Sequence, residues 1–220
     1  MTTCLPTKKS ATNPESYSPM IPADEALQRL QQGNKTFRSG KGFHLETETL
    51  LKLNSQKEQN PFAIILGCSD SRVPAEIVFG QGIGDLFVIR VAGNIVAPSQ
   101  IASIEFAAEN FGTRLVVVLG HSRCGAVQAT LEQLVKPVEN RSPHLYSIVD
   151  RIRPAVESLL QSGSDEDLMT RAVRSNIEAS VNNLRLGSDI LKDLVSEKGL
   201  MIVGAEYCLD TGLVDFFELS

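Results

Sequence analysis

Two short stretches of the sequence contain side chains of the kinds that bind metal ions. Residues 68–72 read Cys-Ser-Asp-Ser-Arg, and residues 121–125 read His-Ser-Arg-Cys-Gly. Two thiolates and one imidazole are a natural ligand set for zinc, whose fourth position takes a carboxylate or a water molecule. Cys124 also opens a predicted helix, where the positive end of the helix dipole favours its thiolate. Taken alone, each stretch could hold a cysteine that merely packs as a small hydrophobic side chain, but together they favour a metal site.

Asp70 and Arg72 add charged groups to the first stretch. A carboxylate and a guanidinium two residues apart are costly to bury unless they pair with each other or serve a function. The alternative is an ordinary surface ion pair, which would contribute little to stability. Beside candidate metal ligands, the spacing favours a pair in which Arg72 controls the position of the Asp70 carboxylate.

Both stretches follow apolar runs that have the character of buried strands. The runs are rich in β-branched residues and do not alternate with polar residues, which suits a parallel sheet buried on both faces. Helical patterns lie between them, so we predict an α/β fold with a mostly parallel β-sheet flanked by helices. The two stretches would then meet at the carboxyl ends of the strands. The predicted strands are 62–66, 86–89, 115–119 and 200–203, and the predicted helices are 22–40, 99–111, 127–135, 145–160, 168–184 and 188–195.

Length and composition fit one globular domain. The 220 residues are 42% hydrophobic and carry a net charge of −5, with acidic and basic residues mixed along the chain. This balance gives no reason to expect nucleic acid or a membrane surface as a partner, and no apolar run approaches the roughly 20 residues of a membrane span. We predict a disordered tail over residues 1–21, which lacks the apolar segment of a secretory signal, and a single domain over residues 22–220. The expected location is cytoplasmic.

The candidate metal stretches, taken with the segments around them, resemble the signature of the β-class carbonic anhydrases. The resemblance covers roughly residues 22–218 in order and spacing. It implies an α/β fold, a Zn²⁺ cofactor and assembly into a homodimer or a tetramer. It also implies that the predicted helix 22–40 is an N-terminal helical arm, and we expect its apolar face to pack on a neighbouring chain. The matching segments are 68–74, 84–90, 93–94, 121–125 and 210–212.

The same resemblance implies roles for the residues at the centre. Cys68, His121 and Cys124 would bind zinc. Asp70 would either complete the coordination of the metal or, in the active form, pair with Arg72 and leave room for water. The pairing of Asp70 with Arg72 would then control whether the carboxylate lies on the metal or away from it.

Three further positions match residues that surround the substrate. Gln59 matches a glutamine that hydrogen-bonds the substrate across the dimer interface in plant-like members of the class. Phe87 matches an apolar residue that faces the carbon dioxide pocket, and Gly125 matches a glycine whose backbone approaches the substrate. Ile65 lies where some members have a tryptophan that helps to form a pocket for inhibitory bicarbonate. Gln59 and Ile65 therefore indicate the plant-like branch without bicarbonate regulation, with the active form present at neutral pH.

The resulting prediction is a lyase that carries out the zinc-dependent, reversible hydration of carbon dioxide to bicarbonate and a proton. One alternative is the hydrolysis of carbon disulfide or carbonyl sulfide, which relatives with the same zinc ligands perform and which the ligand residues do not distinguish. A second alternative is a non-catalytic zinc protein with a closed site of four ligands. The Asp70–Arg72 pair argues against this second alternative.

Overall fold

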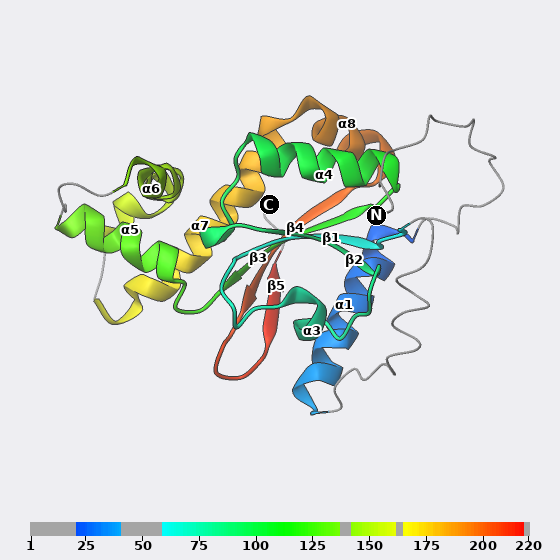
Figure 1. The fold of residues 1–220 in the computed structure, drawn as a ribbon, viewed down its shortest axis with the longest axis horizontal. Helices are drawn as coiled ribbons and strands as arrows, with labels where there is room; N and C mark the ends of the chain where they lie inside the picture. The colour runs from blue at the N-terminus through cyan, green and yellow to red at the C-terminus, as the bar shows by residue number, and fades with distance from the viewer. Residues whose placement is uncertain (1–20, 41–58, 137–141, 162–164, 218–220) are drawn as a thin grey trace, which may run out of the picture.

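The structure is a computed structural model that describes residues 21–40, 59–136, 142–161 and 165–217. These residues form a five-stranded sheet flanked by helices, with the strand order β2-β1-β3-β4-β5 (Figure 1). The first four strands run parallel, and β5 runs antiparallel to β4. The predicted α/β fold with a mostly parallel sheet is confirmed. The strands are β1 Ala63–Gly67, β2 Leu86–Arg90, β3 Leu115–His121, β4 Met201–Tyr207 and β5 Val214–Phe217.

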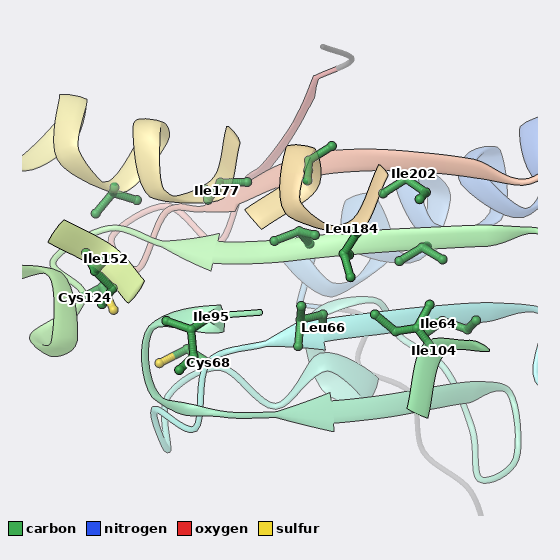
Figure 2. Close-up of a cluster of buried hydrophobic side chains, with 14 of the residues drawn as sticks. Ile64, Leu66, Cys68, Ile95, Ile104, Cys124, Ile152, Ile177, Leu184 and Ile202 are labelled. Atoms are coloured by element: carbon green, nitrogen blue, oxygen red, sulfur yellow. The ribbon is translucent and has the colours of Figure 1, made fainter. Parts of the chain in front are cut away.

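Both faces of the sheet are covered, because alternate side chains of the central strands enter two separate cores. In β1, Ile64 and Leu66 belong to one buried cluster, while Ala63 and Ile65 belong to the other. Figure 2 shows the first cluster, which includes the candidate metal ligands Cys68 and Cys124 at one end. Helices α4 Pro98–Asn110, α7 Asp165–Gly187 and α8 Asp189–Lys198 cover the first face, and α1 Ala23–Arg38 and α3 Ala75–Val78 cover the second (Figure 1).

A pair of helices extends beyond the sheet on the side of the metal stretches. Helix α5 Gly125–Val135 follows β3, and it packs against α6 Pro143–Val156 and α7 (Figure 1). Two short 3₁₀ turns complete the described elements: η1 Ala92–Asn94 follows β2, and η2 Glu157–Gln161 follows α6. The start of α5 therefore lies directly at the carboxyl end of β3.

Helix α1 packs on its own sheet, which differs from the expectation that it packs on a neighbouring chain. Leu30 is fully buried in the same cluster as Ile65 of β1. The Asn34 side chain ties the helix to distant parts of the chain, because its Nδ2 donates to the carbonyl oxygens of Val78 and Gly212 at 3.1 and 2.9 Å. The N-terminal helix is thus present as predicted, but its apolar face finds its partners in segments far along the same chain.

The predicted disordered tail, residues 1–21, lies outside the described residues except for Ile21. Within the described ranges, no helix is both long enough and apolar enough to cross a membrane.

Ile65, whose position bears on regulation, is a fully buried strand residue.

Candidate metal centre

The ends of two neighbouring strands bring the candidate metal ligands together. Cys68 follows β1 directly, His121 is the last residue of β3, and Cys124 precedes the first residue of α5. Because β1 and β3 pair in parallel, their carboxyl ends lie at the same edge of the sheet. The ligand atoms of the three residues all lie within 4.8 Å of one another, and all three residues are buried. The sequence-based grouping of these residues is therefore matched by the geometry.

The donor set suits a zinc ion. His121 Nδ1 lies 3.0 Å from the carbonyl oxygen of Ser122, which can only accept, so Nδ1 carries the ring proton and Nε2 presents a lone pair. His121 Nε2 is buried and has no hydrogen-bond partner among the described residues. A buried acceptor without a partner is costly, and coordination to a metal ion would satisfy it. Two sulfurs and this nitrogen are a common set of protein ligands for zinc.

The two thiols interact strongly with each other. A hydrogen bond with Cys124 lowers the pKa of the Cys68 thiol to about 4. The same interaction, together with burial, raises the pKa of the Cys124 thiol. One proton is therefore shared by the pair, and metal binding would release it because thiolates are the ligand form.

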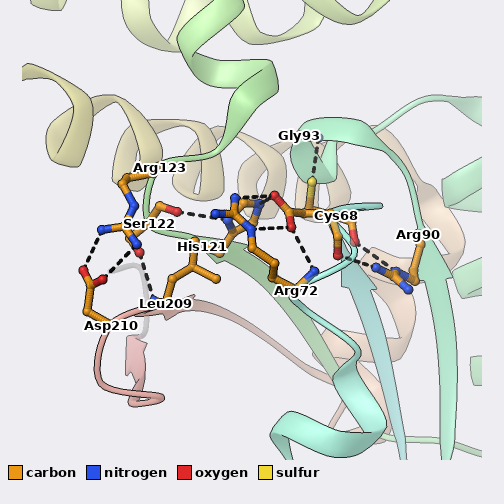
Figure 3. Close-up of polar contacts among 10 residues, drawn as sticks. Cys68, Arg72, Arg90, Gly93, His121, Ser122, Arg123, Leu209 and Asp210 are labelled. Carbon is orange, nitrogen blue, oxygen red and sulfur yellow. Dashed lines mark hydrogen bonds and ion pairs between the residues drawn. The ribbon is translucent and has the colours of Figure 1, made fainter.

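Asp70 lies at the edge of this group and is paired with Arg72. The Asp70 carboxylate accepts two hydrogen bonds from the Arg72 guanidinium, at 2.9 and 2.7 Å, and one from the Arg72 backbone N–H at 3.0 Å (Figure 3). Asp70 Oδ2 also lies 3.8 Å from His121 Nε2. The side chain of Asp70 is 17% exposed and that of Arg72 is 53% exposed, so the pair lies at the mouth of the site. The Arg72 guanidinium holds the pKa of the Asp70 carboxyl well below its usual range.

Two further arginines form hydrogen bonds that hold residues 68–72 and 121–125 in place, and the sequence alone predicts no role for either. Arg90, at the end of β2, donates to the carbonyl oxygens of Cys68 and Asp70 at 3.0 and 2.6 Å. Arg123 has a positive φ of 54° and forms two hydrogen bonds with Asp210, at 2.6 and 2.9 Å (Figure 3). The signal for Arg90 was a single charged residue closing an apolar strand. The partner of Arg123 lies 87 residues away, so the sequence carries no comparable local signal.

Gly125 lies beside the ligands, whereas Gln59 and Phe87 do not. Gly125 is exposed next to Cys124, and a Cβ added to it would meet nothing within 4 Å. Gln59 is exposed before β1, so the five-residue strand, roughly 16 Å long at about 3.3 Å per residue, separates it from Cys68. Phe87 is paired in register with Ile64, in the first half of β1. Neither residue can reach the ligands of its own chain, so any role in the reaction requires a second copy.

Comparison with known proteins identifies the family. The family model for carbonic anhydrase matches residues 63–214. The chain belongs to the carbonic anhydrase family. Carbonic anhydrase 2 of Mycobacterium tuberculosis is 34% identical over 85% of this chain and 89% of its own length. This match favours carbon dioxide hydration over the two alternatives named above.

Solved structures indicate the class within the family. The β-carbonic anhydrase CcaA is 29% identical, covers 88% of this chain and 92% of its own, and superimposes with a TM-score of 0.68. A tetrameric β-carbonic anhydrase of Sordaria macrospora, at 24% identity, covers 88% and 97% of the two chains with a TM-score of 0.66, which shows the shared fold. The resemblance to the β class is thereby confirmed, and this carbonic anhydrase uses the β-class arrangement of strands and helices.

Proposed function

We propose that this carbonic anhydrase interconverts carbon dioxide and bicarbonate with a zinc ion held by Cys68, His121 and Cys124. The observation that carries the proposal is the buried group of two sulfurs and one imidazole nitrogen, whose Nε2 has no protein partner among the described residues. A bound zinc supplies Lewis-acid chemistry and lowers the pKa of water from 15.7 to about 7, which makes a nucleophile available near neutral pH.

Asp70 and Arg72 prepare the site for that nucleophile. Because Arg72 stabilises the charged form, Asp70 is ionised at neutral pH and can only accept hydrogen bonds. An O–H group that donates to Asp70 is thereby oriented, with its lone pair free to face carbon dioxide. Arg72 also keeps the carboxylate turned toward the mouth of the site, as the three hydrogen bonds between them indicate. The pairing fits the predicted active form, whose dependence on pH stays a prediction.

Gly125 leaves space for the substrate beside the ligands. The absence of a side chain at this position leaves the backbone at the start of α5 open to approach. The N–H groups of Ala126 and Val127 at the start of α5 hydrogen-bond the Cys124 sulfur and favour its thiolate, so the open space beside Gly125 is what this end of the helix offers to the substrate. We therefore infer that substrate and product bind next to Cys124 in the space that Gly125 leaves free.

We propose a homo-oligomer, a dimer or a tetramer, in which Gln59 and Phe87 complete the site of a neighbouring chain. Within the described sheet, β2 is an edge strand, and Phe87 on it packs with Phe106 and Phe111 at centroid distances of 6.4 and 6.1 Å. Phe106 is 50% exposed, which leaves an apolar surface at this edge. The Sordaria macrospora proteins with this fold are tetrameric.

A cytoplasmic location and membership of the plant-like branch also remain predictions.

The proposal is tested by measuring zinc content and carbon dioxide hydration on the same preparations. The purified chain should contain one zinc ion per subunit and hydrate carbon dioxide in a stopped-flow assay. Cys68→Ser and His121→Ala should lose zinc and activity together, whereas Cys208→Ser, which alters a cysteine outside the ligand group, should lose neither. Full zinc content and activity in both ligand variants would refute the assignment.

A further inference from the structure

The turn that follows β2 has an unusual backbone and touches a metal ligand. Gly93 and Asn94 in η1 both adopt left-handed conformations, with φ values of 72° and 43°. The backbone N–H of Gly93 points at Cys68 Sγ, with nitrogen and sulfur 3.4 Å apart (Figure 3). A Cβ at position 93 would lie 2.8 Å from Ile152 Cδ1 and 3.0 Å from Ala126 Cβ, so the turn is packed closely against α5 and α6 where it meets the sulfur.

Helix α7 holds this turn through two buried polar side chains. Asn176 Nδ2 donates to the carbonyl oxygen of Gly93 at 2.8 Å, and Ser180 Oγ donates to the carbonyl oxygen of Asn94 at 3.0 Å. Asn176 and Ser180 are four residues apart and therefore lie on the same face of the helix. Both are almost fully buried, at 2% and 3% exposure, where water cannot replace the hydrogen bonds they make.

We propose that Asn176 and Ser180 are positioning residues for the reaction, because they fix the turn that aims the Gly93 N–H at Cys68 Sγ. The peptide group between Gly93 and Asn94 is held at both ends, because its carbonyl oxygen accepts from Asn176 and its N–H donates to the carbonyl oxygen of Val91 at 3.0 Å. Ser180 holds the next carbonyl group. The adjoining Gly93 N–H can then turn little and stays directed at the sulfur. The hydrogen bond stabilises the thiolate, which is the form that binds a metal ion, and it orients the sulfur, so its loss should weaken metal binding. The consequence for zinc rests on the proposed function, whereas the link from α7 to the sulfur does not.

The alternative is that the two side chains only stabilise the packing of α7 on the turn. A variant that weakens the packing of α7 without touching the turn separates these possibilities. Val181 is next to Ser180 on the same helix and is fully buried in the hydrophobic cluster. Val181→Ala therefore serves as a control that destabilises the helix and leaves both hydrogen bonds to η1 in place.

The experiment compares Asn176→Leu, Ser180→Ala and Val181→Ala with the unchanged full-length chain. The first readout is the hydrogen exchange of the Gly93 amide measured by NMR, which needs no metal. We expect exchange to accelerate in Asn176→Leu and Ser180→Ala and to stay near the original rate in Val181→Ala, beyond any change shared by neighbouring amides. The second readout is zinc affinity from competition with a chelator, which should fall about 10–100-fold in the first two variants only.

The outcomes distinguish this inference from the proposed function. Unchanged Gly93 exchange in Asn176→Leu and Ser180→Ala, or losses of zinc affinity equal to those in Val181→Ala, would overturn the positioning role. A chain that shows the expected exchange pattern but binds no zinc, even before substitution, would contradict the proposed function and leave the link from α7 to Cys68 supported. A cobalt-loaded sample adds a check, because the sulfur-to-cobalt absorption should shift in the same two variants and not in the control.

Discussion

Replacing Gly93 with alanine should lower the free energy of unfolding and disturb the metal centre. Both the backbone conformation of Gly93 and its close neighbours contribute to the loss of stability. Gly93 has a φ of 72°, and a non-glycine residue in this conformation costs about 1–2 kcal/mol. The added Cβ would also lie 2.8 Å from Ile152 Cδ1 and 3.0 Å from Ala126 Cβ, and overpacking of this kind costs about 1–3 kcal/mol. Together the two effects predict a loss of roughly 2–5 kcal/mol in the free energy of unfolding.

The chain offers a control that isolates the contact from the backbone strain. Gly199 has a nearly equal φ of 68°, but a Cβ added there would meet nothing within 4 Å. Gly199→Ala should therefore cost only the backbone part, about 1–2 kcal/mol. The comparison is made by urea unfolding at a single protein concentration, because assembly makes the apparent stability depend on concentration.

A second substitution should partly relieve the clash. Ile152→Val removes the Cδ1 atom that the new Cβ would approach most closely, and alone it should cost about 0.5–1.5 kcal/mol. The double variant Gly93→Ala/Ile152→Val should lose less stability than the sum of the two single variants. Strict additivity, or equal losses in Gly93→Ala and Gly199→Ala, would refute the argument that this turn is packed at the limit of contact.

Three other perturbations test separate parts of the molecule. Arg72→Ala should retain zinc but lower turnover by orders of magnitude, because the Asp70 carboxylate loses its two guanidinium hydrogen bonds and can turn toward the metal. Metal analysis with stopped-flow kinetics checks this, and near-normal turnover would contradict it. Leu30→Ala should lower the free energy of unfolding by about 2–5 kcal/mol, since Leu30 is fully buried, and a negligible loss in urea unfolding would show that α1 is not docked on its own sheet. When Gln59→Ala and His121→Ala subunits are mixed, the oligomers that form should be more active than the sum of the two variants measured separately. In a mixed oligomer, the subunit with an intact His121 receives the intact Gln59 of its partner. Simple addition of the two activities would count against a contribution from the partner chain.

The parallel strands could be predicted from the sequence because they are buried on both faces. The runs at 62–66, 86–89, 115–119 and 200–203 correspond to β1 to β4 within a few residues. Strand β5, Val214–Phe217, was not predicted. It is short, lies at the edge of the described sheet and buries only Val214 fully, so it lacks the continuous apolar character that identified the others.

The metal ligands could be predicted, whereas the residues that brace them could not. Cys68, His121 and Cys124 have chemistry that is specific to their residue types, and each lies at the end of a recognisable strand or the start of a helix. The bracing contacts depend on which segments meet in three dimensions. Arg123 binds Asp210 across 87 residues, and Asn176 binds Gly93 across 83. No local pattern reports contacts over such separations.

The contacts of Asn34 have a consequence for the order in which the chain folds during synthesis. The partners of its side-chain amide include the Gly212 carbonyl and the Val214 N–H, which follow it by 178 and 180 residues. At roughly 5–20 residues per second, a ribosome needs about 9–36 s to add the intervening segment. Throughout this interval α1 lacks the hydrogen bonds that join it to Gly212 and to the start of β5. We therefore expect the hydrogen bonds of Asn34 to close only after β5 has been synthesised, so that until then α1 is held by its apolar contacts with earlier segments such as Ile65 of β1.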